Sequence, residues 1–230
     1  MKFKRVTLEN CHEASGLVVV IDVLRAFTTA AFAFGAGAEK ILLVSTVDEA
    51  LVLRNRFSKA FVMGEVFGVK PDSFDFDNSP YTISRTDVNG RVLIQRTSAG
   101  TQGVVCSAGA EILLTGSFVC AQATVDFINQ VQPEWVTFVI TGIREGGYGD
   151  EDTALADYLE MLLRKQTVEA KPYLDRVRQS ISGLKFAEAD RSLSYSHDLA
   201  CAVNLDRFSF AMQVQNQDNR LVLKPVTSFQ

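Results

Sequence analysis

Charged and hydroxyl-bearing residues directly follow several short apolar runs of this sequence. Asp22 and Arg25 come after the first run, Glu65 after the third, and Arg96 and Ser98 after the fourth. In an open α/β sheet, ligands bind in the crevice outside the carboxyl ends of parallel strands. We therefore expect these residues, although distant in the chain, to gather at one edge of a sheet and form a ligand site. For each residue alone, a helix cap or a surface turn is the alternative.

Asp22 abuts the apolar run Val18–Ile21, where a carboxylate is poorly solvated unless it meets a cation or hydrogen-bond donors. A metal ion or Arg25 would meet that need. Arg25 stands near the opening of an expected helix, whose unpaired backbone N–H groups favour an anion. A bidentate contact between its guanidinium and a phosphate is one interpretation, and an internal ion pair with Asp22 is the other.

Two glycine-containing segments carry further candidates. Thr97–Gly103 combines hydroxyls, glycines and backbone donors ahead of a short helical stretch, which suits an oxyanion, although it lacks the lysine of a Walker loop. Gly146–Gly149 precedes Asp150, Glu151 and Asp152, which form either a mobile acidic lid or a solvated turn. We favour the turn for Asp150, and less so for Glu151 and Asp152.

Three other motifs are rejected because of their surroundings. Cys201–Arg207 has the Cys-x5-Arg spacing of cysteine phosphatases but lies in a helical pattern without glycine. Phe74–Ser79 contains the Asp-x-Asp opening of haloacid-dehalogenase-type enzymes but does not end an apolar strand. His12 and His197 are too few for a multi-histidine zinc centre.

Apolar runs of strand length alternate with stretches of helical period, and these elements must position the candidate residues. The expected strands are 17–21, 41–44, 60–63, 92–95, 111–114 and 136–140. Helices are expected from about Ala26, after a cap at Ser45 or Thr46, over 118–131 after a cap at Ser117, and over 153–163, and 171–207 has a helical pattern.

Repeated βα alternation predicts an α/β fold, a three-layer sandwich with a mainly parallel, mixed sheet. Segments 208–214 and 221–226 are expected to form a C-terminal antiparallel strand pair that closes an edge of that sheet. No repeat or long linker divides the chain, so residues 1–230 are predicted to form a single α/β unit, within which two subdomains of unresolved boundary stay open.

The amino-acid composition limits the classes of molecule that this protein is expected to bind. The 230 residues are 47% hydrophobic and carry a net charge of −4, which gives no overall attraction to nucleic acid or to an anionic membrane. The apolar stretch 17–38 contains Asp22 and Arg25, so it does not predict a transmembrane helix. Four widely spaced cysteines favour a reducing cytoplasm over a disulfide-rich secreted fold. The oligomeric state stays open, a homodimer included.

The motifs, taken together, resemble those of the 2-phosphosulfolactate phosphatase family. The matching segments, in chain order, are Asp22–Thr29, Gly64–Glu65, Phe74–Pro80, Thr97–Thr101 and Glu151–Thr153. The resemblance covers most of the chain. It implies an α/β fold and Mg²⁺-dependent hydrolysis of a phosphomonoester to sulfolactate and phosphate, on the route to coenzyme M.

The resemblance also implies roles for individual residues. Asp22, Arg25 and Glu65 would be catalytic, and one or two carboxylates from Asp22, Glu65, Glu151 and Asp152 would hold the Mg²⁺ ion, which prefers oxygen ligands. The expected contacts to the small anionic phosphoester are Thr28, Asn78, Ser79, Arg96, Ser98, Thr101 and Arg144. Direct attack by water and a covalent step both remain open, and we prefer Asp22 as a metal ligand over Asp22 as a nucleophile.

Four positions depart from the family pattern. Asp77 stands where glycine is expected, Ser98 and Ala99 where threonine and asparagine are usual, and Cys120 where asparagine is common. These departures leave the expected fold and chemistry in place, but they leave open a different small phosphoacid as substrate. A non-catalytic anion-binding protein on the same fold is the alternative from another functional class.

Overall fold

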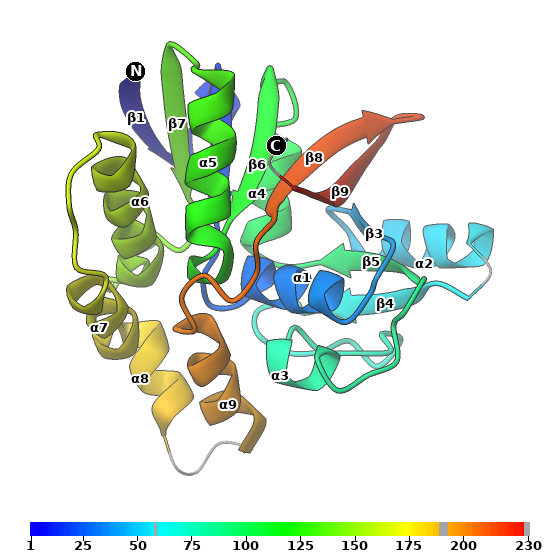
Figure 1. The fold of residues 1–230 in the computed structure, drawn as a ribbon. Helices are drawn as coiled ribbons and strands as arrows, with labels where there is room; N and C mark the ends of the chain where they lie inside the picture. Colours follow the sequence, from blue (N-terminus) through cyan, green and yellow to red (C-terminus); the bar gives the residue numbers. More distant parts are fainter. Residues whose placement is uncertain (58, 189–192, 228–230) are drawn as a thin grey trace.

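The structure of the protein is a computed structural model that describes residues 1–57, 59–188 and 193–227. Within this part of the chain, one nine-stranded mixed sheet has the strand order β1-β7-β2-β6-β8-β9-β3-β5-β4 (Figure 1). The strands are β1 (Lys2–Thr7), β2 (Leu17–Ile21), β3 (Lys40–Leu43), β4 (Phe61–Gly64), β5 (Val92–Arg96), β6 (Ile112–Gly116), β7 (Trp135–Ile140), β8 (Ala211–Gln217) and β9 (Arg220–Val226). The predicted α/β class with a mainly parallel, mixed sheet is confirmed.

The sheet consists of two parallel arms joined by an antiparallel hairpin. The first arm contains β1, β7, β2 and β6, and the second arm contains β3, β5 and β4. Between the arms, β8 pairs with β6 and β9 pairs with β3, both antiparallel. The expected antiparallel pair therefore exists, but its expected place at a sheet edge is wrong. The hairpin lies inside the sheet because Met212, Val214 and Leu223 are buried in the core that both arms share.

Helices cover the sheet on both sides. They are α1 (Ala26–Gly35), α2 (Val47–Arg56), α3 (Pro80–Ile83), α4 (Gly100–Cys106), α5 (Ala121–Val131), α6 (Asp150–Leu163), α7 (Lys171–Gln179), α8 (Ile181–Ala187) and α9 (Leu193–Ala202), with short 3-10 turns η1 (Cys11–Glu13) and η2 (Phe118–Cys120). Residues 189–192 of the expected helical stretch lie outside the described residues. No described helix combines the length and the apolar character that a membrane crossing requires.

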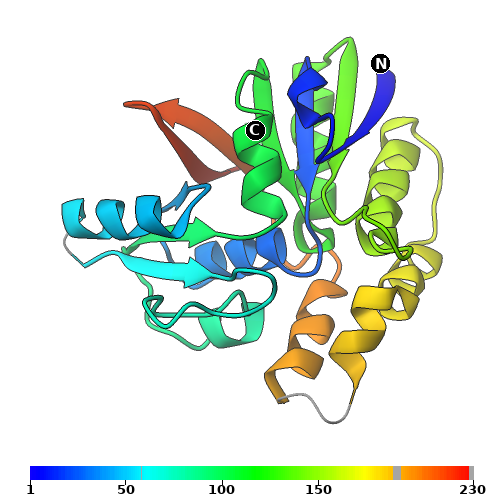
Figure 2. The same cartoon turned by 180° about the vertical axis from the view of Figure 1, so that it is seen from behind.

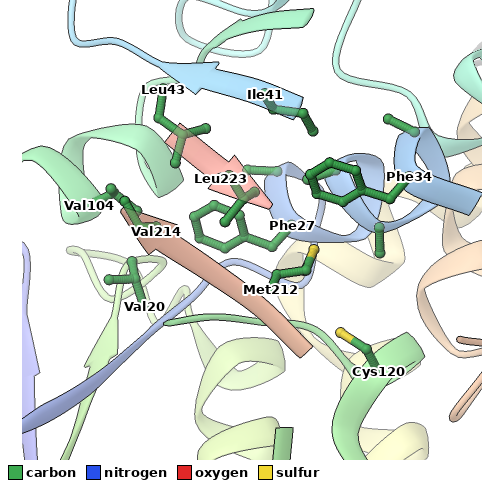
Figure 3. Packing of buried hydrophobic residues seen from close by; sticks show 14 of the residues in the cluster. Val20, Phe27, Phe34, Ile41, Leu43, Val104, Cys120, Met212, Val214 and Leu223 are labelled. Carbon is green, nitrogen blue, oxygen red and sulfur yellow. The ribbon is translucent and has the colours of Figure 1, made fainter. Parts of the chain in front are cut away.

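Strand β2 is buried on both faces, as its sequence predicts. Val18 and Val20 pack in the core cluster that contains α1, whereas Val19 and Ile21 pack in the cluster that contains α5 and α6. Figure 3 shows Phe27 and Phe34 of α1 beside side chains of the hairpin and of both arms. Burial of an aromatic ring of this size stabilises the fold by roughly 1.5–3 kcal/mol, so α1 is fixed at the junction of the arms.

Local signals succeed at some helix starts and fail at others. Thr46 caps α2 as expected, because its Oγ1 accepts a hydrogen bond from the N–H of Glu49 at 3.1 Å. Ser117 does not cap the following helix through its side chain, and its Oγ instead lies 2.6 Å from Thr28 Oγ1. The structure also joins Cys11 to Cys106 by a disulfide across 95 residues, which their separation in the sequence did not predict.

Candidate active site

The carboxyl ends of strands from both arms meet near the N-terminus of α1. Figures 1 and 2 show the strands of the two arms running toward the middle of the molecule, with α8 and α9 beside this region. Asp22 follows β2, Glu65 follows β4, and Thr141 follows β7. Three antiparallel pairings separate β6 from β3, so the two arms run in opposite directions, and the ends of their strands meet because the sheet bends between the arms (Figure 1).

Asp22 is buried at this junction, with 6% of its surface exposed. Its Oδ1 accepts a hydrogen bond from the N–H of Ala26, the first residue of α1, at 3.0 Å. Burial raises the pKa of Asp22 to about 6, against the lowering effect of hydrogen bonds from the Ala26 and Gly100 backbones, and the charges of Glu65 and Glu151 raise it further. The site thus brings several carboxylates close together at the end of β2, where a cation would relieve their repulsion.

Glu151 and Asp152 lie side by side in the first turn of α6 but have different surroundings. Asp152 accepts hydrogen bonds from the N–H groups of Val23 and Gly142, each at 2.8 Å, and so ties α6 to the ends of β2 and β7. Burial, and after it the negative charge of Glu151, raises the pKa of Asp152 well above its usual value. Glu151 is 3% exposed, and its Oε2 has no hydrogen-bond partner among the described residues. A buried carboxylate oxygen without a partner is costly, so Glu151 is the acid here that is positioned to receive a ligand.

Glu65 holds the loop that precedes α4. Its Oε1 accepts a hydrogen bond from the N–H of Ser98 and its Oε2 from the N–H of Gly68, both at 2.5 Å. Arg96 holds the same loop, because its Nη1 donates a hydrogen bond to the Glu65 carbonyl at 2.8 Å and another to Ser98 Oγ at 3.1 Å. These three predicted site residues do converge, and their contacts to one another shape the backbone of the Thr97–Gly103 loop.

Arg25 is buried, and its described ion-pair partners do not include Asp22. Its Nη1 donates to Asp198 Oδ2 at 2.8 Å, and Asp77 Oδ2 lies 3.8 Å away. The ring of Phe186 lies 5.0 Å from its Cζ. The expected alternative, an ion pair between Arg25 and Asp22, is wrong because the nearer carboxylate comes from α9, 173 residues along the chain.

Asp198 is the residue of this site that the sequence did not reveal. It is fully buried, and besides Arg25 it accepts hydrogen bonds from Ser79 Oγ at 2.6 Å and from the N–H of Tyr81 at 3.1 Å. Burial raises the pKa of Asp198, against the lowering effect of Arg25. One acid therefore connects α9, the start of α3 and Arg25. The available signal was an aspartate between His197 and Leu199 in a helical stretch.

The other predicted contacts divide into buried and exposed groups. Thr28, Ser79 and Thr101 have no exposed surface, and their hydroxyls already bond to protein atoms. Asn78 is 3% exposed and its Oδ1 accepts from Gln95. These four residues lie within the framework around the site. Arg144 lies apart from them, on the exposed turn between β7 and α6.

The described carboxylates can be tested for a fit to Mg²⁺. No group of three or more described His, Cys, Asp or Glu side chains is arranged around a common metal position. Mg²⁺ usually keeps several waters and takes only one or two protein carboxylates, so such a cluster is not required. Both carboxylate oxygens of Glu65 and of Asp152 accept backbone N–H groups. Glu151 instead has an unpartnered oxygen, and its charge raises the pKa of Asp22 although the Ala26 and Gly100 backbones donate to that carboxylate. Asp22 and Glu151 therefore fit a magnesium ion best.

The fold and the site together define an α/β protein with a group of buried carboxylates at the ends of its strands, where enzymes of this fold class bind their ligands. Comparison with known proteins gives the family. Residues 4–217 match the family described as 2-phosphosulpholactate phosphatase, and the chain belongs to this family of phosphoric monoester hydrolases. The resemblance seen in the sequence is confirmed.

Individual relatives agree with the family match. A protein of Bacillus subtilis described as a probable 2-phosphosulfolactate phosphatase is 31% identical over 198 residues, which cover 86% of each chain. A protein of Carboxydothermus hydrogenoformans with the same description is 30% identical over 221 residues, or 90% of each chain. A third, from Microcystis aeruginosa, is 34% identical over 173 residues, which cover 74% of this chain and 71% of the relative.

Proposed function

We propose that this protein hydrolyses the phosphomonoester of 2-phosphosulfolactate, or of a closely similar small phosphoacid, to sulfolactate and phosphate, and that it requires Mg²⁺. The descriptions of the family and of its relatives support the substrate. The observation that carries the metal requirement is the buried, unpartnered Oε2 of Glu151 beside the raised pKa of Asp22. Two poorly compensated carboxylates at the end of β2 favour a cation between them.

In this proposal, Asp22 and Glu151 hold the ion. Bound Mg²⁺ would supply a Lewis acid that polarises the phosphoryl group and orients an attacking water. Asp22 keeps its orientation through the N–H of Ala26, and Asp152 fixes the first turn of α6, from which Glu151 projects. Glu65 and Asp152 then act as positioning residues for the backbone around the site.

The phosphoryl group needs positive charge, because the protein as a whole carries −4. Arg25 supplies a buried guanidinium whose Nη1 is fixed by Asp198. Arg96 and Ser98 orient the Thr97–Gly103 loop, whose backbone donors suit an oxyanion. Positioning and electrostatic stabilisation together account for most of the catalysis of phosphoryl transfer.

A different phosphoacid is the second candidate substrate, and Asp77 favours it. The Asp77 side chain is 30% exposed and lies 3.8 Å from Arg25, at a position where the family pattern expects glycine. A carboxylate there lowers the positive potential that a substrate anion meets. A phosphoacid with one acidic group besides its phosphate would tolerate Asp77 better than one with two.

The test is phosphate release from a panel of small phosphoacids, with Mg²⁺ or with EDTA. The panel contains 2-phosphosulfolactate, 2-phospholactate, 2-phosphoglycolate and glycerol 2-phosphate. We expect release from at least one acid of the panel in Mg²⁺, loss of release in EDTA, and recovery when Mg²⁺ is added back. Full activity after exhaustive chelation would refute the metal requirement, and no release from any compound would refute the phosphatase function.

A further inference from the structure

Two cations share one aromatic ring on the turn between β7 and α6. The Cζ atom of Arg144 lies 4.2 Å from the centroid of the Tyr148 ring, and Lys185 Nζ lies 4.5 Å from the same centroid. Lys185 also donates a hydrogen bond to the Tyr148 hydroxyl. This hydrogen bond, together with the nearby charges of Lys185 and Arg144, lowers the pKa of Tyr148. Positive charge is therefore concentrated around this ring.

Neither cation is neutralised by a carboxylate in the part of the chain that the structure describes. Other basic residues do have such partners there, among them Arg5 with Asp157 and Arg176 with Asp150. For Arg144 and Lys185, the described polar and ring contacts lead to Tyr148. Two uncompensated cations a few ångströms from one ring attract an anion and can both donate hydrogen bonds to it.

Helices α6 and α8 connect the pair of cations to the candidate active site. Tyr148 precedes the first turn of α6, which carries Glu151. Lys185 is followed in α8 by Phe186, whose ring lies 5.0 Å from the Cζ of Arg25. Lys185 and Phe186 leave α8 in different directions, so this one helix contacts Tyr148 through Lys185 and Arg25 through Phe186. Helix α8 also supports the turn, because a Cβ at Gly147 would lie 3.5 Å from Ile181 Cδ1.

We propose that Arg144 and Lys185, on the ring of Tyr148, form an anion subsite for a carboxylate or sulfonate of the substrate that is remote from its phosphoryl group. This inference rests on the proposed function, in which Arg25 and the Mg²⁺ ligands serve the phosphoryl end. A short phosphoacid carries its second anion only a few bonds from phosphorus, so it needs a second cationic group next to the first. Arg144 and Lys185 provide that group from the turn and from α8.

The subsite makes the enzyme discriminate between phosphoesters by their acidic group. Removal of one cation should raise KM for 2-phosphosulfolactate, or for whichever acid of the panel is turned over, by about ten-fold or more, because charge-assisted hydrogen bonds are lost. Turnover of glycerol 2-phosphate, which has no second acidic group, should change little.

The variants are Arg144→Met and Lys185→Met, with Lys224→Met as the control. Lys224 is half-buried like Lys185 and changes the net charge equally, but its position on β9 lies toward the amino-terminal end of β3, away from the strand ends of the site. All three variants should melt close to the wild-type temperature without ligand. The kinetic comparison of acidic and neutral phosphoesters is then made for each.

A titration of sulfolactate itself tests the subsite without turnover. By calorimetry or thermal shift, wild type and Lys224→Met should bind sulfolactate with similar affinity, and Arg144→Met and Lys185→Met should bind it about ten-fold or more weakly. Equal affinity in all four proteins, or no binding by wild type, would overturn the subsite. If no phosphoester is hydrolysed, the proposed function fails, but this titration still decides the subsite separately.

Discussion

Replacement of Asp22 by asparagine separates a metal ligand from a structural acid. Burial raises the pKa of Asp22 from 3.8 to about 6, a shift that corresponds to about 3 kcal/mol at roughly 1.4 kcal/mol per unit. Because the folded state binds this proton more tightly than the unfolded state, the ionised group destabilises the metal-free fold above about pH 6. The free energy of unfolding of the wild type therefore falls by this amount as the pH rises from about 4 to about 6, and below about pH 4 the burial of Asp22 has no such effect.

Asp22→Asn removes that cost while it preserves an oxygen that can accept from the N–H of Ala26. Arg25 keeps its partner, because its near carboxylate is Asp198. In metal-free protein at pH 7.5, the variant should therefore melt at the same temperature or higher. The upper limit is about 6–12 °C, from roughly 2–4 °C per kcal/mol for a chain of this size. At pH 4 the two proteins should melt together.

The assay pairs metal-free melting curves at both pH values with phosphate release over a Mg²⁺ titration. We expect Asp22→Asn to lower turnover by orders of magnitude and to raise the Mg²⁺ concentration that is required. Asp72→Asn, at an exposed aspartate, is the matched control and should change neither quantity. A marked fall of the metal-free melting temperature at pH 7.5, with unchanged Mg²⁺ dependence, would refute the assignment of Asp22.

Three further substitutions test the neighbouring groups. Arg25→Lys should lower kcat/KM by roughly 10- to 100-fold, because an ammonium cannot reproduce a planar guanidinium on phosphate; kinetics equal to wild type would make Arg25 a structural residue. Asp198→Asn should destabilise the protein by about 3 kcal/mol or more in denaturant unfolding, since Arg25 loses its near counter-charge; unchanged stability would contradict the ion pair. Cys201→Ser should leave turnover intact, because burial raises the pKa of Cys201 to about 11 and keeps the thiol protonated at neutral pH; abolished activity in a folded variant would make Cys201 the nucleophile.

The sequence predicts most of the repeating βα architecture, because each element there carries its own local signal. The run 17–21 is apolar and β-branched throughout, and the structure buries it on both faces. Strand β1 escapes prediction, since Lys2, Lys4 and Arg5 interrupt it and Val6 is its one fully buried residue. The position of the C-terminal hairpin within the sheet is also not predicted, because the sequence of a strand does not show whether one or both of its edges pair with other strands.

The candidate site is predictable where one chain segment carries the signal. Asp22, Glu65 and Arg96 each stand at the end of a strand, and parallel pairing of β4 with β5 brings Glu65 beside Arg96. Asp22 meets them only because the sheet bends between its two antiparallel arms. Asp198 and Lys185 come from α9 and α8, and no periodicity places these helices against the strand ends. Long-range packing decides their positions, so only the folded chain reveals that Arg25 meets Asp198 and that Tyr148 meets Lys185.

The acids of this site differ in how fully protein groups pair their oxygens. Glu65, Asp152 and Asp198 each accept two or more hydrogen bonds, which hold their side chains in place. Glu151 keeps a buried oxygen without a partner among the described residues, and burial and neighbouring acids raise the pKa of Asp22 although backbone groups donate to it. An acidic protein can therefore bind an acidic substrate if a cation neutralises these two carboxylates and the basic side chains face the remaining anions. On this view, loss of the metal should weaken substrate binding as well as catalysis, because the uncompensated charges of Asp22 and Glu151 would then repel the phosphoryl group.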